Sequence, residues 1–197
     1  KIVLSIMGKQ GSFVKRFTDI LISIISLILT FPIFILAALA IKLESKGPVF
    51  FIQERTGLNG KAFNMIKFRG MIDNALKYGP ELTQQNDPRI TKVGRFLRRT
   101  SIDELPQFIN VLKGEMSIVG PRPEILSITS QYSDEHKEVF KYIPGITGYS
   151  QRNGRQMLTP EQRTKMEIDY YNNETFGGDF KIMLKTFFVV ISNEGNI

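Results

Sequence analysis

The stretch that decides the fold runs from Ile20 to Ile41 and reads ILISIISLILTFPIFILAALAI, without a charged residue. Its length is that of a membrane helix, which needs ~20 apolar residues to cross the hydrocarbon core. Lys15 and Arg16 precede the run and Lys42 comes directly after it, so both of its ends are basic. Because positive charge favours the cytoplasmic side of a membrane, both ends are expected on the same side.

Pro32 divides this apolar run near its middle. Proline donates no backbone hydrogen bond and clashes with the preceding turn, so it kinks or breaks a helix. Thr30 lies close enough to bond a carbonyl that the proline frees. Each half has about a dozen residues, or roughly 18 Å of rise, which suits a single leaflet. We therefore expect an interfacial lead-in and a re-entrant helix–break–helix hairpin in residues 1–46, with the break near Pro32.

Two other interpretations of the run stay open. One is an ordinary transmembrane helix that is kinked at Pro32. The other is a cleavable signal peptide, because a basic segment precedes the run and Ala38-Leu39-Ala40 offers the small residues of a cleavage site. The run is longer than the usual ~7–15 apolar residues of a signal peptide. The residues C-terminal to the run have to decide among the three.

The composition limits the class of protein. The chain has 197 residues and a formal net charge of +7, which fits an anionic membrane surface, phosphorylated substrates or nucleic acid. Beside a membrane segment, the first two are preferred. The chain has no cysteine, which excludes disulfides and thiolate metal sites. Its one histidine, His136, lies in the charged segment SDEHKE without the spacing of a zinc site.

The rest of the chain, residues 47–197, is predicted to be one domain of the α+β class, mostly helical with short strands. Strands are expected at 49–53, 62–68 and 116–119, and glycine with proline indicates a turn at 144–148. Helices are expected at 92–99, at 101–113 with Gly114 as its C-terminal cap, at 124–142 and at 159–171. Residues 179–191 indicate an amphipathic C-terminal helix, which suits either the core or a membrane surface.

The segment SIDELPQ, which begins at Ser101, is the strongest local signal of chemistry. Ser101 and Glu104 match a capping box, a pattern that only starts a helix. Helix capping explains Asp103 less well. Because Arg98 precedes the segment and further arginines lie in PRP and NGR loops, the acids indicate a phosphate-bearing substrate. An ionised carboxylate would then serve as a nucleophile or a metal ligand.

Four stretches resemble the monotopic phosphoglycosyl transferases, the bacterial sugar transferase family that starts glycan assembly on polyprenol phosphate. They are KRFTDI with the apolar run, FIQERTGLNGKAFNMIKFRGM, RFLRRTSIDELPQFINVLKGEMSIVGPRP and PGITGYSQRNGR. They agree with the family in order and spacing, and the resemblance covers the chain from about Lys15 to about Tyr171. The length is similar to that of the minimal, single-domain members, which lack an additional N-terminal domain.

The resemblance implies an enzyme with an Asp-Glu dyad at Asp103 and Glu104, and residues 47–197 as its catalytic domain. The aspartate would attack the β-phosphate of a UDP-sugar, release UMP and hold a phosphoglycosyl group. Polyprenol (undecaprenyl) phosphate would then take that group. The resemblance also implies Mg²⁺ at the dyad, with the glutamate as general base or metal-organising group. It places the protein in one leaflet, at the cytoplasmic face of the bacterial plasma membrane.

Further residues receive roles from the same resemblance. The expected phosphate-binding cations are Arg98, Arg122, Arg155, Lys67 and Arg69, and the loop-shaping residues are Pro121 and Pro123. Two positions depart from the family pattern, because Phe31 stands where minimal members carry serine before the hairpin proline, and Gly70 where threonine is frequent. Lys15 and Arg16 lie at the mouth of the apolar run, so we expect them to attract the lipid phosphate head group.

Other functions remain as alternatives. A membrane-anchored basic module that binds lipid or nucleic acid would use Asp103 and Glu104 for helix capping only. Nucleic acid is not expected as a partner, because no aromatic RNA-binding motif accompanies the charge. A secreted protein would result from cleavage after Ala40. The apolar C-terminal helix is compatible with a homodimer. The sugar stays open between UDP-linked N-acetylated amino sugars and UDP-glucose or UDP-galactose.

Overall fold

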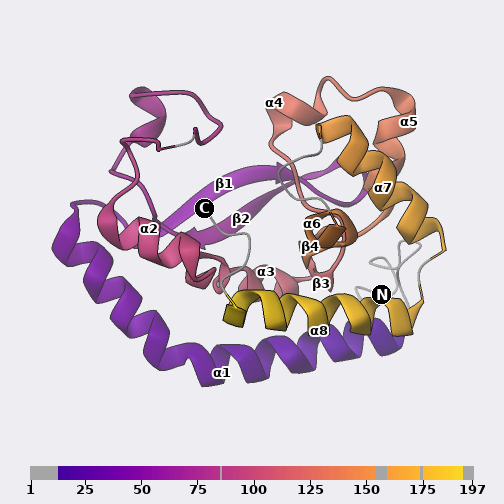
Figure 1. Cartoon of the computed structure of the whole chain (residues 1–197), viewed down its shortest axis with the longest axis horizontal. Coiled ribbons are helices and arrows are strands. Elements are labelled where there is room, and N and C mark those ends of the chain that lie inside the picture. Colours follow the sequence, from indigo (N-terminus) through magenta and orange to yellow (C-terminus); the bar gives the residue numbers. More distant parts are fainter. Residues whose placement is uncertain (1–12, 85, 154–158, 174, 193–197) are drawn as a thin grey trace.

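The computed structural model describes residues 13–84, 86–153, 159–173 and 175–192. The described residues form an α+β arrangement of helices and short strands, as predicted (Figure 1). The helices are α1 (Phe13–Glu44), α2 (Lys92–Arg99), α3 (Gln107–Lys113), α4 (Leu126–Thr129), α5 (Asp134–Lys137), α6 (Tyr149–Asn153), α7 (Pro160–Asn172) and α8 (Phe176–Ser192). The strands are β1 (Phe50–Thr56), β2 (Ala62–Phe68), β3 (Ser117–Val119) and β4 (Gly145–Thr147).

Helix α1 contains the whole apolar run and continues through Pro32, so one bent helix stands where two short helices are expected. Figure 1 shows the bend midway along α1. Pro32 has no N–H to give to the carbonyl of Ile28 one turn earlier. The Thr30 hydroxyl donates to the carbonyl of Ser26 at 2.6 Å, rather than to that freed carbonyl. Back-bonding of this kind bends helices without ending them.

Both ends of α1 are fastened to the rest of the protein. Near its start, the buried Asp19 carboxylate accepts hydrogen bonds from the Ser117 hydroxyl at 2.8 Å and from the Ile118 amide at 3.2 Å, on β3. Near its end, Ala37 and Ile41 are buried with residues of β2 and α2. A cleaved leader would remove these contacts from the core, which argues against the signal-peptide interpretation. The predicted domain boundary at residue 46 falls in the connection between α1 and β1.

The remaining surface of α1 is apolar and exposed. Ile28 is 67% exposed, Leu29 is 72% exposed and Leu36 is 67% exposed. Among the described residues, α1 is the one helix that is long and apolar enough to cross a membrane. Apolar side chains in a continuous exposed stripe of this length indicate contact with lipid. The coarse prediction of an apolar N-terminal membrane anchor therefore agrees with the structure.

Strands β1 and β2 form an antiparallel hairpin in which Phe50 pairs with Phe68. The free edge of β2 is closed by Asn110 of α3, which is fully buried. Its side-chain oxygen accepts from the Ile66 amide at 3.1 Å, and its amide nitrogen donates to the Asn64 carbonyl at 2.7 Å. One side chain thus satisfies one amide and one carbonyl of the free strand edge and fixes α3 against the hairpin.

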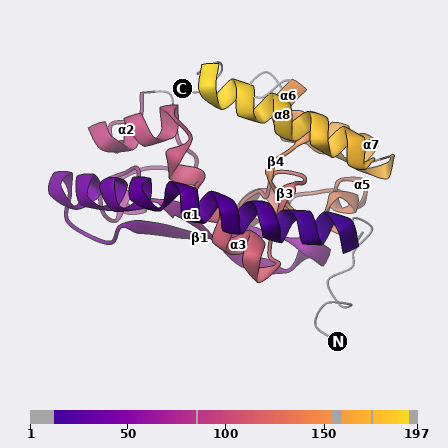
Figure 2. The same ribbon diagram turned by 90° about the horizontal axis from the view of Figure 1, so that it is seen from below.

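Strands β3 and β4 pair in parallel, although residues 144–148 are predicted to form a turn. The prediction was wrong because these glycines serve close backbone approach as well as turning. A Cβ on Gly120 would lie 2.3 Å from the Ile143 carbonyl oxygen, and one on Gly145 would lie 2.1 Å from the Gly120 nitrogen. Helix α8 packs on the other side of this pair, so β3 and β4 lie between α8 and α1 (Figure 2).

The predicted helices differ in how well they match. Residues 124–142 form α4, α5 and a short 3-10 turn instead of one helix. Helix α7 begins as predicted, since the Thr159 hydroxyl accepts from the Gln162 amide and the Gln162 side chain bonds back in a capping box. Helix α8 starts at Phe176, three residues before the prediction. Gly114 caps α3 in the left-handed conformation with φ of 84°.

Candidate active site

Asp103 and Glu104 lie on a single 3-10 turn, Ile102–Glu104, between α2 and α3. The expected helix from residue 101 to 113 is divided here, and α3 begins only after Pro106. Ser101 has a φ of 56° and its side chain makes no capping hydrogen bond. The capping-box interpretation is therefore wrong for Ser101 and Glu104. The tight turn instead presents the two acids to a cleft.

The Glu104 carboxylate is held by two cations from separate parts of the chain. Lys67 of β2 donates to Glu104 Oε1 at 2.8 Å, and Arg122 Nη2 lies 3.6 Å from the same oxygen. Lys67 and Arg122 come from the KFR and PRP segments, so the structure brings three predicted site residues together. Charge-assisted bonds of this kind fix the orientation of the carboxylate.

Asp103 is buried, with 9% of its surface exposed. Its carboxylate accepts no hydrogen bond from any other described residue. Burial raises the pKa of Asp103, and the neighbouring Glu104 charge raises it further, while Lys67, Arg98 and Arg122 act in the opposite direction. A desolvated carboxylate without hydrogen bonds, surrounded by cations, is suited to attack an electrophilic phosphorus.

The dyad opens into a cleft of about 1100 Å³ between the β1–β2 hairpin and the segment that comes after it. Apolar side chains form part of its wall, among them Phe51, Ile52, Leu76 and Leu82. The charged residues that line it are Arg55, Lys67, Arg69, Asp73, Lys77, Glu81, Arg89, Arg98, Asp103, Glu104, Arg122, Glu124 and Arg163. Such a cleft can hold a ligand with both phosphates and a less polar part.

Arg98 lies at the cleft because the first turn of α2 is held in place by Glu44. Glu44 is the last residue of α1, and its carboxylate accepts hydrogen bonds from the amides of Lys92 and Val93, each at 2.8 Å. The Arg98 guanidinium reaches Thr83 Oγ1 at 3.3 Å across the cleft. The membrane helix thus sets the position of a cation near the dyad. Arg155, also predicted to bind phosphate, lies outside the described residues.

Pro121 and Pro123 hold the loop that carries Arg122. The Pro121 carbonyl accepts from the Gly145 amide at 2.9 Å, and the Pro123 carbonyl accepts from Arg55 Nη1 at 3.3 Å. These bonds fasten the loop to β4 on one side and to β1 on the other. The GPRP segment comes directly after β3 and the PGITG segment contains β4. The pairing of β3 with β4 therefore brings the two segments together.

Arg69, which is predicted to bind phosphate, has other partners. Its buried guanidinium donates to the carbonyl and the hydroxyl of Ser45, each at 2.9 Å, and to the carbonyl of Lys46. Although Arg69 lines the cleft, its donors hold the chain just after α1. The structure therefore gives it a tethering role that spacing alone does not indicate.

Lys15 and Arg16 lie apart from the dyad and do not line the cleft. Lys15 pairs with Asp179 of α8. Arg16 donates to the carbonyls of Val111 and Leu112, at 2.7 and 3.0 Å, in the last turn of α3. Helix C-termini leave such carbonyls without internal partners. Binding of a lipid head group by these two cations stays a prediction, and both are engaged inside the protein.

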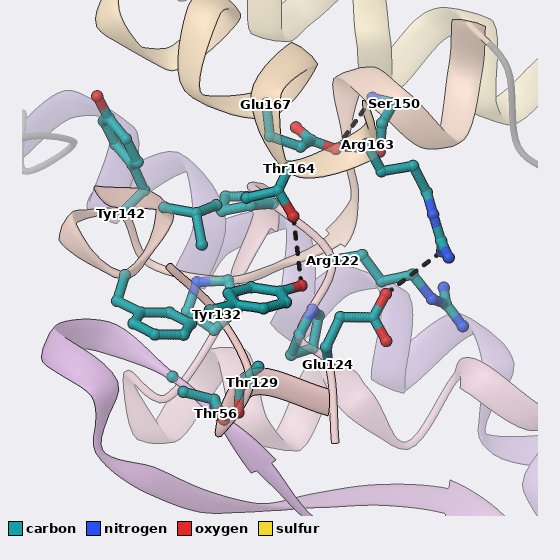
Figure 3. Close-up of a pocket in the computed structure, with 16 residues that line it drawn as sticks. Thr56, Arg122, Glu124, Thr129, Tyr132, Tyr142, Ser150, Arg163, Thr164 and Glu167 are labelled. Carbon is teal, nitrogen blue, oxygen red and sulfur yellow. Dashed lines mark hydrogen bonds and ion pairs between the residues drawn. The ribbon is translucent and has the colours of Figure 1, made fainter. Parts of the chain in front are cut away.

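Prediction from the sequence missed a cluster of charged residues in the cleft, formed by Arg55, Glu124 and Arg163. Glu124 lies between the two arginines. Arg163 Nη1 is 3.3 Å from its carboxylate (Figure 3), and Arg55 Nη1 is 4.0 Å from it. They come from β1, the loop before α4, and α7. Each alone has the pattern of a solvated surface charge, so only the fold brings them together.

A small second cavity of about 30 Å³ adjoins this cluster (Figure 3). Its wall includes Glu167 of α7, a buried carboxylate that accepts from the amide of Ser150 at 2.9 Å and from its hydroxyl. Burial raises the pKa of Glu167 to about 7. These bonds connect α7 to α6, the next helix after β4, beside the small cavity.

The residues present fit a magnesium ion that is shared with substrate. Among the described residues, no group of three or more His, Asp or Glu side chains could hold a metal ion alone. Asp103 and Glu104 supply two adjacent carboxylates at the cleft. Mg²⁺ is commonly bound by one or two carboxylates together with phosphate oxygens, so this donor set is adequate.

Comparison with known proteins agrees with the site. A family model described as bacterial sugar transferase matches residues 10–193. The UDP-N-acetylgalactosamine-undecaprenyl-phosphate N-acetylgalactosaminephosphotransferase of Aeromonas hydrophila is 40% identical over 93% of this chain. The UDP-glucose:undecaprenyl-phosphate glucose-1-phosphate transferase of Escherichia coli K12 is 45% identical over 88%. The uncharacterized sugar transferase EpsL of Bacillus subtilis is 39% identical over 92% of this chain and 89% of its own length.

The chain spans less than half of the first two of these relatives, with 45% and 39% of their lengths covered. The family match itself extends over nearly the whole chain and includes the dyad, the PRP loop and the membrane helix. The chain therefore belongs to the bacterial sugar transferase family.

Proposed function

We propose that the protein moves a sugar-1-phosphate from a UDP-sugar to polyprenol (undecaprenyl) phosphate, releases UMP and so initiates bacterial glycan assembly. The observation that carries the proposal is the buried Asp103 carboxylate, which accepts no hydrogen bond from the described residues and lies beside Lys67, Arg98 and Arg122. The names of two relatives support the substrate classes, because both contain a UDP-sugar and undecaprenyl phosphate.

The reaction proceeds through a covalent aspartyl intermediate. An Asp103 oxygen forms a bond to the β-phosphorus, and the bond from that phosphorus to the bridging oxygen breaks. UMP leaves with the bridging oxygen and its electron pair. An oxygen of the polyprenol phosphate then bonds to the same phosphorus, and the electron pair of the broken bond returns to Asp103. Splitting one transfer between two anions into two steps lowers the charge repulsion of each.

The cations of the cleft neutralise charge in both steps. Lys67, Arg98 and Arg122 surround the dyad and stabilise the phosphoryl oxygens as charge develops on them. Arg155 joins them in this proposal, and Pro121 and Pro123 hold Arg122 in place. Glu104 orients Lys67 and Arg122. Asp103 and Glu104 would hold Mg²⁺, which supplies further neutralisation of the phosphates.

The chain lies in one leaflet, at the cytoplasmic face of the bacterial plasma membrane. Helix α1 rises about 48 Å at 1.5 Å per residue, and both of its ends contact the same folded body. A helix fastened at both ends cannot place them on opposite sides of a bilayer. The bend at Pro32 lets the exposed middle enter the lipid and return, which is the re-entrant arrangement.

Labelling of single cysteines tests this topology, because the natural chain has none. Thr18→Cys and Ser45→Cys lie near the two ends of α1. Both are expected to react with a membrane-impermeant maleimide from the cytoplasmic side only. Labelling from opposite sides would refute the re-entrant arrangement.

Release of UMP tests the proposed activity. Purified wild-type protein is supplied with undecaprenyl phosphate, Mg²⁺ and in turn UDP-glucose, UDP-galactose and UDP-N-acetylated sugars. We expect one or more donors to give UMP, and Asp103→Asn to abolish its release. Asp134→Asn is the matched control, since Asp134 is an exposed carboxylate outside the cleft. Full UMP release by Asp103→Asn would disprove the assigned nucleophile.

The alternative of a basic binding module explains the structure less well. It requires Asp103 and Glu104 to act as helix caps, whereas the structure turns them toward the cations of the cleft. A homodimer through the exposed Phe180, Leu184 and Phe188 of α8 stays a prediction.

A further inference from the structure

The cleft contains an ion-pair cluster that the proposed reaction does not use. Glu124 lies between Arg163, at 3.3 Å, and Arg55, at 4.0 Å, and we name these three residues the arginine bridge. Figure 3 shows the side chains of Arg122, Glu124 and Arg163 on the same side of the neighbouring cavity. All three members line the cleft of the dyad. A single carboxylate between two guanidinium groups leaves the bridge with one excess positive charge.

The bridge is held rigidly. The side chains of Arg55 and Glu124 are each 16% exposed, and that of Arg163 is 29% exposed. Arg55 also donates to the Gln53 side chain at 2.7 Å and to the Pro123 carbonyl at 3.3 Å. Side chains fixed in this way lose little further freedom when an anion binds, which favours binding.

Two hydrogen-bond donors of the bridge have no partner within the described residues. The Nε atoms of Arg55 and Arg163 are both buried and have no hydrogen-bond partner there. Burial lowers the pKa of Arg55 to about 10 and the nearby Arg122 acts in the same direction, while the charges of Glu124, Glu81 and Glu104 act in the opposite direction. A buried guanidinium with an idle donor and a like charge nearby gains stability when an anion approaches.

Arg122 connects the bridge to the dyad. Its guanidinium lies 3.6 Å from Glu104, and its charge also acts on Arg55. A phosphate at Asp103 therefore has Arg122 beside it, and the next anionic group along the cleft meets the bridge. This order matches the two linked phosphates of a nucleoside diphosphate sugar.

The stereochemistry of the covalent reaction implies that the phosphate position next to the reacting phosphorus is occupied twice, once in each step. In each step the entering and leaving oxygens lie roughly in line at the phosphorus. Asp103 is one of these two groups in both steps. UMP departs from the side opposite Asp103, and the acceptor phosphate has to enter from that same side. The two phosphates therefore occupy one place in turn.

We propose that the arginine bridge is the subsite for the phosphate next to the reacting one, first the α-phosphate of the UDP-sugar and then the phosphate of the polyprenol acceptor. This proposal rests on the covalent reaction proposed above. Arg55 and Arg163 contact the phosphate oxygens, and Glu124 is a positioning residue that spaces the two guanidinium groups.

Two measurements on the full chain in lipid nanodiscs with Mg²⁺ test the subsite. The first is equilibrium binding of UMP and of uridine, which lacks the phosphate. The second isolates the sugar-phosphate adduct and chases it with UMP or with polyprenol phosphate. The variants are Arg163→Gln, Arg163→Lys, Arg55→Gln and, as a control, Arg95→Gln, an exposed arginine of α2 that does not line the cleft.

We expect Arg163→Gln to raise the Kd for UMP about tenfold or more, which is the effect of one lost charge-assisted hydrogen bond. The Kd for uridine should not change. The concentrations of UMP and of polyprenol phosphate for half-maximal chase should rise by a similar factor, with partial recovery in Arg163→Lys. No change in either concentration would overturn the subsite, and a rise in only one would overturn its shared use. Because Arg163 is the more exposed arginine, it carries the test if Arg55→Gln does not fold.

The two proposals fail in different ways. If wild-type protein turns over a donor in the presence of lipid but forms no adduct without it, the covalent reaction is refuted, while the UMP binding series still decides whether the bridge binds phosphate. If the adduct forms but Arg163→Gln binds UMP like the control, the bridge is structural and the reaction stands.

Discussion

Lys67 and Arg69 are two residues apart on the same side of the hairpin, and they have different partners. Lys67 donates to the Glu104 carboxylate in the cleft, whereas Arg69 donates to the backbone and hydroxyl at the end of α1. The same contrast separates Arg122 from Arg16, which binds the carbonyls at the end of α3. One set of cations surrounds the dyad and the other fastens the membrane helix. A basic residue in this family pattern is therefore not necessarily a ligand for phosphate.

The largest expected effect is the loss of catalysis when a cation beside the dyad is removed. Lys67→Met removes the donor that orients Glu104 and a positive charge near the phosphoryl group. We expect kcat/KM for UMP release to fall about 10²- to 10³-fold, the usual effect of removing one donor to developing charge. The melting temperature is measured alongside, because the Lys67 side chain is only 16% exposed and a loss of folding has to be separated from a loss of catalysis. An unchanged kcat/KM would place Lys67 outside the chemistry and remove the contrast with Arg69.

Arg69→Met should have the opposite profile. It removes a buried guanidinium and leaves the carbonyls of Ser45 and Lys46 without that donor. We expect a loss of about 1–3 kcal/mol in the free energy of unfolding, measured by denaturant titration in detergent. The KM for UDP-sugar should stay within about twofold, since that change corresponds to under 0.5 kcal/mol. A large rise in KM with normal stability would return Arg69 to the phosphate-binding set.

The smallest effect concerns the pH dependence of adduct formation. Asp103 has to be ionised to attack, and its raised pKa means that protonation begins at a higher pH than for a solvent-exposed aspartate. The acid limb of the single-turnover rate should therefore lie above the ordinary carboxylate range. Arg122→Gln removes a charge that lowers this pKa and should move the limb to higher pH. Glu104→Gln removes a charge that raises it and should move the limb to lower pH.

These opposite shifts are measured in rapid-quench experiments at saturating Mg²⁺. Shifts of the same sign in both variants would contradict the assignment of the limb to Asp103. Lys113→Gln, a substitution of an exposed lysine at the end of α3, serves as the control and should leave the limb in place.

The sequence predicts best those elements whose signals are local. The strand at residues 62–68, the glycine cap at Gly114 and the capped start of α7 at Thr159 depend on neighbouring residues only, and the structure has all three. The strand at 145–147 depends on pairing with β3, which is distant in the chain. Its glycines indicate a turn by composition, although they allow two backbones to meet.

The site shows the same division. Asp103 and Glu104 are recognised because adjacent acids after an arginine-rich helix have a short sequence signature. The arginine bridge draws on β1, the loop before α4, and α7, so no short segment contains it. The sequence favours a break at Pro32 and keeps a continuous kinked helix only as an alternative, whereas α1 is continuous because packing at Asp19 and Ile41 stabilises both halves. Tertiary contacts decided each of these cases.

The most direct measurement of the central proposal is the intact mass of the protein after incubation with UDP-sugar and Mg²⁺, without any lipid acceptor. Wild-type protein and Asp103→Asn are compared, and the released nucleotide is identified. We expect wild-type protein alone to gain the mass of one sugar phosphate and to release UMP in equal amount. A donor that is turned over when lipid is present, but that leaves no adduct on wild-type protein without lipid, would contradict the covalent role of Asp103.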